Sequence, residues 1–442
     1  MICVKTLSVV FYTYHNISRM KTNFSLPARS LLCAWLLCLL LPVGLKAQQD
    51  STLQRFTAVS GTVKDGNSRK ALSQVSVSVA GSHIGTVTNA DGYFLLKIDA
   101  KIQKGKILIS DLGYKSLKIP FHGREIAETD YFLTPEEYVL PMAVVDGWKP
   151  TELVAEAVRK VGENYSQEAC LLTGFYRETA QKGRRFINIA EAVLSIYKTS
   201  YPGDVMQDRV QVRKGRELLC TKPSDTLGVR ILGGPNVSVY LDIVKNQEFL
   251  FNEETRSYLN FAFEEQVFID ERAHYVVRFS PNISLSYPLY HGRLYIDKKR
   301  LSFTRIEMHL DTSDPDKVTQ HILRKKPASM RFKPEDIYTE VHYRTQDGKT
   351  YLNYIRNEIK FACDWRRRLF ATRYTAISEM VVTDMLKGQV LPISRRLSFN
   401  ESQSLSKTVG NFYDENFWEA YNIIEPSESL ETAVGRLKRQ SR

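Results

Sequence analysis

The sequence predicts a β-rich protein of two domains: a seven-strand-type β-sandwich, then an α+β domain with a large antiparallel sheet and a few helices on one face. Short alternating segments recur about every ten residues between positions 60 and 135, a spacing typical of β-sandwiches. From Leu171 onward, longer period-two segments combine β-branched and aromatic residues. Few segments have apolar residues at helical spacing, so we predict more β-sheet than helix.

The predicted boundaries are 1–47 for a leader, 58–136 for the sandwich, 137–150 for a linker and 151–442 for the α+β domain. The leader begins at Met20, the expected start of translation. Basic residues there precede an apolar run, Leu31–Leu41, and a small-residue cleavage site at Ala47. This run is shorter than the ~20 residues of a membrane span, which favours a cleaved leader over an uncleaved anchor. We therefore expect export to the periplasm or the outer membrane.

The net charge of the chain limits the classes of partner that we expect. Removal of residues 1–47 takes away five basic residues and no acidic one, which lowers the net charge from +12 to +7. A mildly basic chain suits anionic envelope surfaces. It lacks the concentrated basic stripe of a nucleic-acid-binding protein, so a nucleic-acid partner is not expected.

The predicted sandwich is clearest between positions 74 and 98. Val75, Val77 and Val79 alternate with polar residues, which indicates a strand with one buried face. Asn89–Gly92 has the composition of a type I turn that closes on a left-handed glycine, and Tyr93–Ile98 resumes as a strand. The segments KILIS and LKIPF follow as two further strands.

These features resemble the carboxypeptidase-regulatory-like domain. The features that match are Gly61, the Asp65-Gly66 turn, the Val75/Val77/Val79 strand, Gly85-Thr86 and Asn89–Phe94. The resemblance implies a transthyretin-like sandwich, which often stands at the front of envelope proteins of the Bacteroidetes type. It implies an accessory domain without a peptidase.

A peptidase site is not supported by the residues. A zinc carboxypeptidase needs His-x-x-Glu and a distant histidine, so that three ligands leave one position open for water. His122-Gly-Arg-Glu125 matches the short motif, but it follows a sandwich strand and is expected in a surface loop. No Gly-x-Ser-x-Gly elbow occurs, and Cys170, Cys220 and Cys363 have apolar contexts typical of buried thiols. The other histidines occur singly, so no catalytic residue, metal or cofactor is predicted.

In the second domain, residues 151–165 have the pattern of an amphipathic helix with Thr151 as a possible cap. Residues 238–251 form a second helix-like segment, and a closing helix follows Ser427 as its candidate cap. Gly233-Gly234-Pro235 indicates a turn.

Two hairpins are expected, at Asp297–Lys299 and at Gln346–Lys349. The first of them, within residues 292–310, is similar to the strand-turn-strand units of lipoprotein-carrier-like half-barrels. The order of segments over the mature chain is similar to an uncharacterised Bacteroidetes envelope family, which implies no established activity.

Basic clusters are the candidate contact site. They comprise Arg324, Lys325, Lys326, Trp365, Arg366, Arg367 and Arg368. Arginine beside tryptophan can stack on planar groups or bind phosphates and carboxylates, so these residues could face an anionic lipid or glycan. A solvated hairpin loop is the alternative.

Three functions stay open at this stage. The favoured one is a non-enzymatic exported envelope protein, in which the sandwich accompanies a β-rich domain that binds a ligand or an envelope protein. The second is lipid or lipoprotein handling by a half-barrel sheet. The third is a hydrolase with an unrecognised site.

Overall fold

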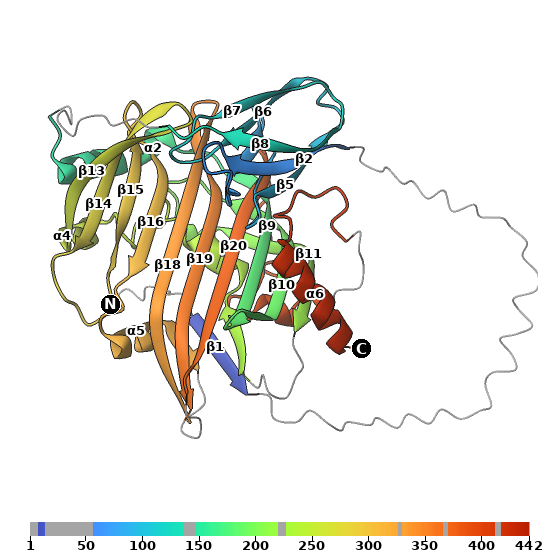
Figure 1. The fold of residues 1–442 in the computed structure, drawn as a ribbon. Helices are drawn as coiled ribbons and strands as arrows, with labels where there is room; N and C mark the ends of the chain where they lie inside the picture. Colours follow the sequence, from blue (N-terminus) through green and yellow to red (C-terminus); the bar gives the residue numbers. More distant parts are fainter. Residues whose placement is uncertain are drawn as a thin grey trace, which may run out of the picture.

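The computed structural model describes residues 8–13, 56–136, 147–219, 227–325, 329–365, 370–411 and 417–441. A small sandwich lies at the upper end of a large curved sheet (Figure 1). The structure is therefore mainly β, with two parts in the predicted order. Most of the predicted leader and of the linker lies outside the described residues, so the cleavage site stays a prediction.

The sandwich has seven strands in two sheets, ordered β5-β2-β8 and β4-β3-β6-β7. The strands are β2 (Phe56–Asp65), β3 (Ser76–Val79), β4 (Gly85–Val87), β5 (Tyr93–Asp99), β6 (Gly105–Ser110), β7 (Leu117–Phe121) and β8 (Ile126–Leu133). Val75, Val77 and Val79 are buried between the sheets, as their alternation predicts. The seven-strand-type sandwich is confirmed.

The turn between β4 and β5 has the predicted chemistry. Asn89 Oδ1 accepts hydrogen bonds from the backbone N–H groups of Asp91 and Tyr93, both at 2.9 Å. Gly92 closes the turn with φ +76°, a conformation that glycine adopts without steric cost. A Cβ at this position would lie 2.6 Å from a carbonyl oxygen, so both the dihedral and the space require glycine.

The large sheet has the order β13-β14-β15-β16-β18-β19-β20-β9-β10-β11-β21. Its strands are β9 (Cys170–Lys182), β10 (Arg185–Lys198), β11 (Arg209–Leu219), β13 (Leu259–Ile269), β14 (Arg272–Pro281), β15 (Tyr290–Asp297), β16 (Phe303–Leu310), β18 (Met330–Gln346), β19 (Lys349–Trp365), β20 (Thr372–Leu386) and β21 (Gly410–Asn411). All pairs are antiparallel except the short β11–β21 pair. Both predicted hairpins are present, as the β15–β16 and β18–β19 connections.

A separate three-stranded sheet has the order β12-β1-β17. Its members are β1 (Ser8–Thr13), β12 (Leu227–Leu232) and β17 (Leu323–Lys325). β1 pairs antiparallel with β12 and parallel with β17.

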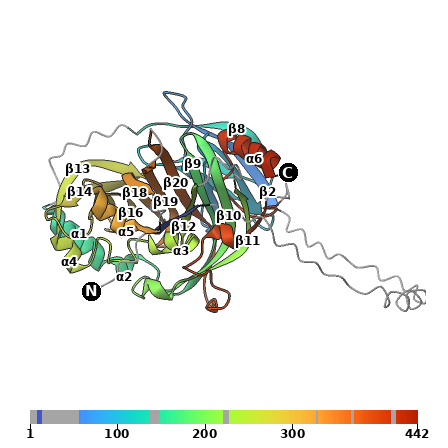
Figure 2. The same ribbon diagram turned by 90° about the horizontal axis from the view of Figure 1, so that it is seen from below.

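Short helices cover one face of the large sheet. They are α1 (Pro150–Arg159), α2 (Val161–Asn164), α3 (Pro235–Tyr240), α4 (Glu253–Ser257) and α5 (Pro315–Ile322), with the 3-10 turns η1 (Val205–Gln207) and η2 (Leu405–Lys407) elsewhere. Figure 2 shows α1 to α5 on the side of the sheet away from the sandwich. Val239 of α3 and apolar residues between α3 and α4, among them Ile243, Val244 and Phe251, belong to the main apolar core with the sheet. The chain's own side chains thus fill this face.

The opposite face carries the sandwich and also α6 (Glu428–Ser441), which corrects the expectation that the helices share one face (Figure 2). A segment that we call the strap, residues 417–427, joins the sandwich to the sheet. Asn422 Oδ1 accepts from Lys97 N (2.7 Å), and its Nδ2 donates to Lys97 O (2.9 Å). Thr86 and Asn89 donate to strap carbonyls at 2.8 and 2.9 Å. The sandwich is therefore tied to the strap through β4, β5 and the turn that joins them.

Two helix predictions need correction. The first helix begins at Pro150 with Lys149 as its N-cap and no side-chain cap bond, so Thr151 is not the cap. Proline at the first helical position lacks an N–H that would need a partner, which explains the earlier start. Residues 238–251 are mostly turns after α3, because their apolar groups pack into the sheet individually. The prediction for Ser427 is confirmed, since its Oγ accepts a backbone N–H of α6 at 3.3 Å.

Candidate ligand-binding pocket

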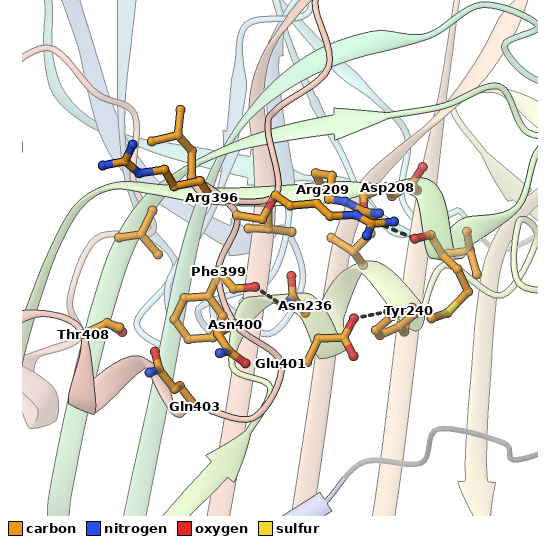
Figure 3. Close-up of a pocket in the computed structure, with 18 residues that line it drawn as sticks. Asp208, Arg209, Asn236, Tyr240, Arg396, Phe399, Asn400, Glu401, Gln403 and Thr408 are labelled. Atoms are coloured by element: carbon orange, nitrogen blue, oxygen red, sulfur yellow. Dashed lines mark hydrogen bonds between the residues drawn. The ribbon is translucent and has the colours of Figure 1, made fainter.

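A polar pocket of about 840 Å³ lies beside β11, near the β11–β21 edge of the large sheet (Figure 3). Three chain segments, near residues 205–212, 236–240 and 395–408, form its walls. Each segment is held to another by hydrogen bonds, so the pocket is built by the fold.

The helix α3 forms one wall. The turn before it, which the sequence predicts, has φ +86° at Gly233 and +45° at Gly234, and Pro235 begins the helix. Gly233 N donates to Gln403 O (2.9 Å), and Asn236 Nδ2 donates to Phe399 O (3.0 Å). The start of α3 is thereby fixed to the segment that crosses it.

The crossing segment is also tied to the sheet and to the end of α3. Phe399 N donates to Val210 O in β11 (2.7 Å), which anchors the segment at the sheet edge. Tyr240 OH donates to Glu401 Oε1 (2.7 Å). Burial and this carboxylate raise the pKa of Tyr240 well above its usual range, so the phenol stays protonated and donates.

Three arginines give the pocket its charge. Arg209 donates to the carbonyls of Met206 (2.6 Å) and Asp208 (2.8 Å), which orients its guanidinium along η1. Arg395 and Arg396 are exposed and, among the described residues, have no acidic partner within ion-pair distance. In Figure 3 the Arg209 guanidinium points toward η1 and that of Arg396 points to the opposite side. The lining is therefore basic, with amide groups between the arginines.

A buried cluster of four charges supports the pocket from behind. Lys198 Nζ lies 2.6 Å from Asp242 and 3.3 Å from Asp208, and Lys245 Nζ lies 2.6 Å from Asp208. All four side chains are at most 3% exposed, and Tyr343 OH donates to Asp242 at 2.8 Å. Burial lowers the pKa of Lys198, but the two carboxylates outweigh it and raise the pKa above its usual value. Asp208, which lines the pocket, is therefore neutralised by lysines and does not cancel the arginines.

Among the described residues that line this pocket, none is one of the basic residues singled out in the sequence. Arg324 and Lys325 lie in β17, whereas Lys326 and Arg366–Arg368 lie outside the described residues. Trp365 pairs with the first residue of β18, is half-buried and packs against the main apolar core. Its ring thus packs against the core, and contact of these basic residues with an anionic surface stays a prediction.

Other candidate residues have structural surroundings. His122 and Glu125 are exposed between β7 and β8, as expected for a surface loop. His291 and His309, which look isolated in the sequence, face each other across β15 and β16 with ring centroids 5.6 Å apart. His309 also contacts Asp336 at 2.9 Å. In the described part of the chain, no group of three His, Cys, Asp or Glu side chains is placed to hold a metal ion.

The thiols have little nucleophilic character. Cys170 and Cys363 are buried and free. Burial disfavours the thiolate and raises the pKa of Cys170 to about 11 and that of Cys363 to about 12. Cys220 lies outside the described residues.

A row of charged residues crosses the sheet face that meets the strap. Each member pairs directly with the next: Arg216, Glu191, Arg177, Glu379, Arg356, Glu340, Glu307, Arg293 and Arg278. Arg177 lies 2.6 Å from Glu191 and Arg356 lies 2.8 Å from Glu379, and Arg177 donates to a strap carbonyl at 2.7 Å. Because neighbouring charges largely compensate each other, this row joins strands and strap and is a weaker candidate for a ligand site.

A second pocket, of about 240 Å³, lies where sandwich, strap and sheet meet. Glu425 of the strap and Arg177 of the sheet both line it. Burial raises the pKa of Glu425 to about 7; the charges of Lys97 and Arg177 oppose this, and those of Glu191 and Glu431 add to it. The strap thus carries a carboxyl group that titrates near neutral pH.

Comparison with known proteins supports the resemblance of the front domain that the sequence indicates. Residues 59–145, which include the sandwich, match the CarboxypepD_reg-like domain. No curated protein matches the chain. No helix in the described part of the chain has the length and apolar character needed to cross a membrane.

Several solved structures show distant similarity. A DUF1329 family protein from Desulfovibrio piger has 10% identity and a TM-score of 0.22, over 53% of this chain and 94% of that one. A protein from Bacteroides fragilis, described as membrane-associated and of unknown function, has 10% identity and a TM-score of 0.15, over 75% and 99%. Lipovitellin has 8% identity and a TM-score of 0.25, over 57% and 28%. At these scores the similarity carries no functional information.

Proposed function

We propose that this protein is a non-enzymatic binding protein of the cell envelope with the sandwich as an accessory domain. Its arginine-lined pocket would hold an anionic hydrophilic group, such as the carboxylate or phosphate of a glycan or of a lipid headgroup. The observation that carries the proposal is the 840 Å³ pocket, whose lining combines Arg209, Arg395 and Arg396 with amide side chains. Arginine binds carboxylates and phosphates through paired hydrogen bonds, which suits this lining.

The charge balance supports an anion over a cation. The acidic residues of the lining are Asp208 and Glu401. Lysines neutralise Asp208, and Glu401 accepts from Tyr240. The arginines therefore determine the sign of the local potential, which attracts an anion.

Two other functions have less support. An acyl-chain carrier needs an apolar cavity, whereas the sheet face opposite the sandwich is packed with the chain's own apolar residues and the large pocket has a polar lining. A hydrolase needs converging acid, base or nucleophile groups. The candidate groups do not have this character, because the buried thiols have raised pKa values and the lysines and aspartates of the buried cluster pair with one another.

Isothermal titration calorimetry tests the proposal with purified chain beginning after Ala47. The probes are trigalacturonate and glycerol 1-phosphate, with maltotriose as a neutral control. We expect at least one anionic probe to bind, and Arg396→Gln to weaken it roughly 10- to 100-fold because a charge-assisted contact is lost. Arg184→Gln, an exposed arginine in the β9–β10 turn, is the matched control and should bind as the wild type does. Equal binding of anionic and neutral probes, or of none, contradicts the proposal.

A further inference from the structure

We propose that the loop of residues 390–397 docks the protein on an anionic membrane surface, and that the adjoining pocket receives the phosphate of a phospholipid headgroup. The inference rests on the proposed anion-binding role of the pocket, and it names the source of the anion.

The loop exposes apolar side chains that the fold does not require. Leu391 is 87% exposed and Leu397 is 56% exposed. Met206, 38% exposed, lines the same pocket as Leu397. Loop surfaces are usually polar, and burying a leucine releases substantial free energy, so exposed leucines here indicate a second, apolar environment.

Cationic groups stand between these apolar side chains. A tight turn presents Arg395 and Arg396, because Ser394 O accepts from Leu397 N (3.0 Å) and from Ser398 N (3.1 Å). Both arginines are exposed and line the pocket rim. Their positive charge complements an anionic lipid surface, which attracts basic residues within about a Debye length, roughly 10 Å.

The combination fits the interfacial zone of a membrane. There, leucine side chains reach the boundary of the acyl chains while arginines extend to the phosphates. The pocket is too polar for an acyl chain but has room for a headgroup, with Arg209 and Asn236 inside and the loop arginines at its rim. The small apolar area, interrupted by arginines, suits such shallow insertion.

Co-sedimentation with vesicles tests this docking. Purified chain beginning after Ala47 is mixed with vesicles of phosphatidylcholine alone, or with 30% (about one lipid in three) phosphatidylglycerol, at low salt. We expect binding to the anionic vesicles and weak binding to the neutral ones. Leu391→Asp should lower the apparent association constant at least about tenfold, because one leucine is no longer inserted. Ile283→Asp is the matched control: Ile283 is 46% exposed on the β14–β15 connection, toward the opposite edge of the sheet, and its variant should bind as the wild type does.

Calorimetry with soluble glycerol 1-phosphate separates docking from the pocket itself. Under the proposal, Leu391→Asp loses vesicle binding and keeps glycerol 1-phosphate binding. Wild-type protein that binds glycerol 1-phosphate but not the vesicles overturns the membrane inference and leaves the proposed function standing. If the wild-type protein binds neither glycerol 1-phosphate nor the vesicles, the membrane inference is wrong, and so is the proposal that the pocket binds a phosphate. If the Leu391→Asp and Ile283→Asp variants bind the vesicles equally well, the loop of residues 390–397 has no role in docking.

Discussion

The buried four-charge cluster behind the pocket makes a sharp prediction for Asp242→Asn. The substitution keeps the shape of the side chain and an acceptor for Tyr343, but it removes one negative charge from a site that is at most 3% exposed. Lys198 and Lys245 are then left to share Asp208. Burial and the charge of Lys198 already lower the pKa of Lys245 to about 8, so one lysine is left either without a counter-charge or deprotonated, and both states cost free energy. Breaking a buried pair in this way costs about 3–5 kcal/mol, which is the expected loss in the free energy of unfolding.

The loss is measured by equilibrium urea unfolding at pH 7, followed by circular dichroism. Lys198→Met combined with Asp242→Asn restores neutrality, so the double variant should be less destabilised than the sum of the single variants by about 1–3 kcal/mol. Glu152→Gln is the surface control, because its pair with Lys149 spans 3.3 Å with side chains 56% and 80% exposed. Its cost should stay below about 1 kcal/mol. An Asp242→Asn variant within about 1 kcal/mol of the wild type would refute the reasoning.

Three further predictions concern the sandwich, the thiols and the strap. Gly92→Ala should lower stability by more than Gly81→Ala, because both have positive φ but only Gly92 has a carbonyl oxygen within 2.6 Å of the new Cβ. In a chain whose other cysteines are replaced by serine, Cys170 and Cys363 should react with a disulfide reagent at pH 8 only after unfolding. The reason is that burial raises the pKa values of these two thiols to about 11 and about 12. For Glu425, whose folded pKa of about 7 exceeds the ordinary 4.5, the stabilising contribution is present below pH 4.5 and is lost as pH rises through 7.

The matching measurements are direct. Urea midpoints of the two glycine variants give their ranking, and equal midpoints would show that the contact at Gly92 relaxes. Rapid thiol labelling of native protein would contradict the buried, protonated state. Glu425→Gln, which mimics the neutral carboxyl group, should flatten the fall in stability between pH 4.5 and 7. An unchanged slope would show that the strap carboxyl is not buried in solution.

The sequence correctly predicts those elements whose conformation is set by residues adjacent in the chain. Asn89–Gly92 and Gln346–Lys349 read correctly as turns because their own side chains and glycines set the backbone. Helical periodicity was misleading at 238–251, where apolar spacing reflects packing against the sheet and α3 alone is helical. Tertiary contacts thus outweighed local propensity.

The pocket was beyond sequence reasoning because its walls come from segments separated by up to about 200 residues. Arg395-Arg396, which stands between Leu391 and Leu397, was a usable signal, but the denser basic run near Trp365 was favoured. That run lies partly outside the described residues, and the tryptophan packs inward. Equally, neither lysine of the four-charge cluster looks unusual in the sequence, because only the fold brings Lys198 and Lys245 to the same carboxylate.

The most direct test of the central claim, that the arginine-lined pocket binds an anion, is a crystal structure of the chain with the tighter-binding of trigalacturonate and glycerol 1-phosphate. We predict density for the anionic group between Arg209, Arg396 and Asn236, within hydrogen-bond distance of a guanidinium. A ligand bound instead at the exposed Arg278 and Arg293 of the sheet, with the pocket empty, would contradict the account.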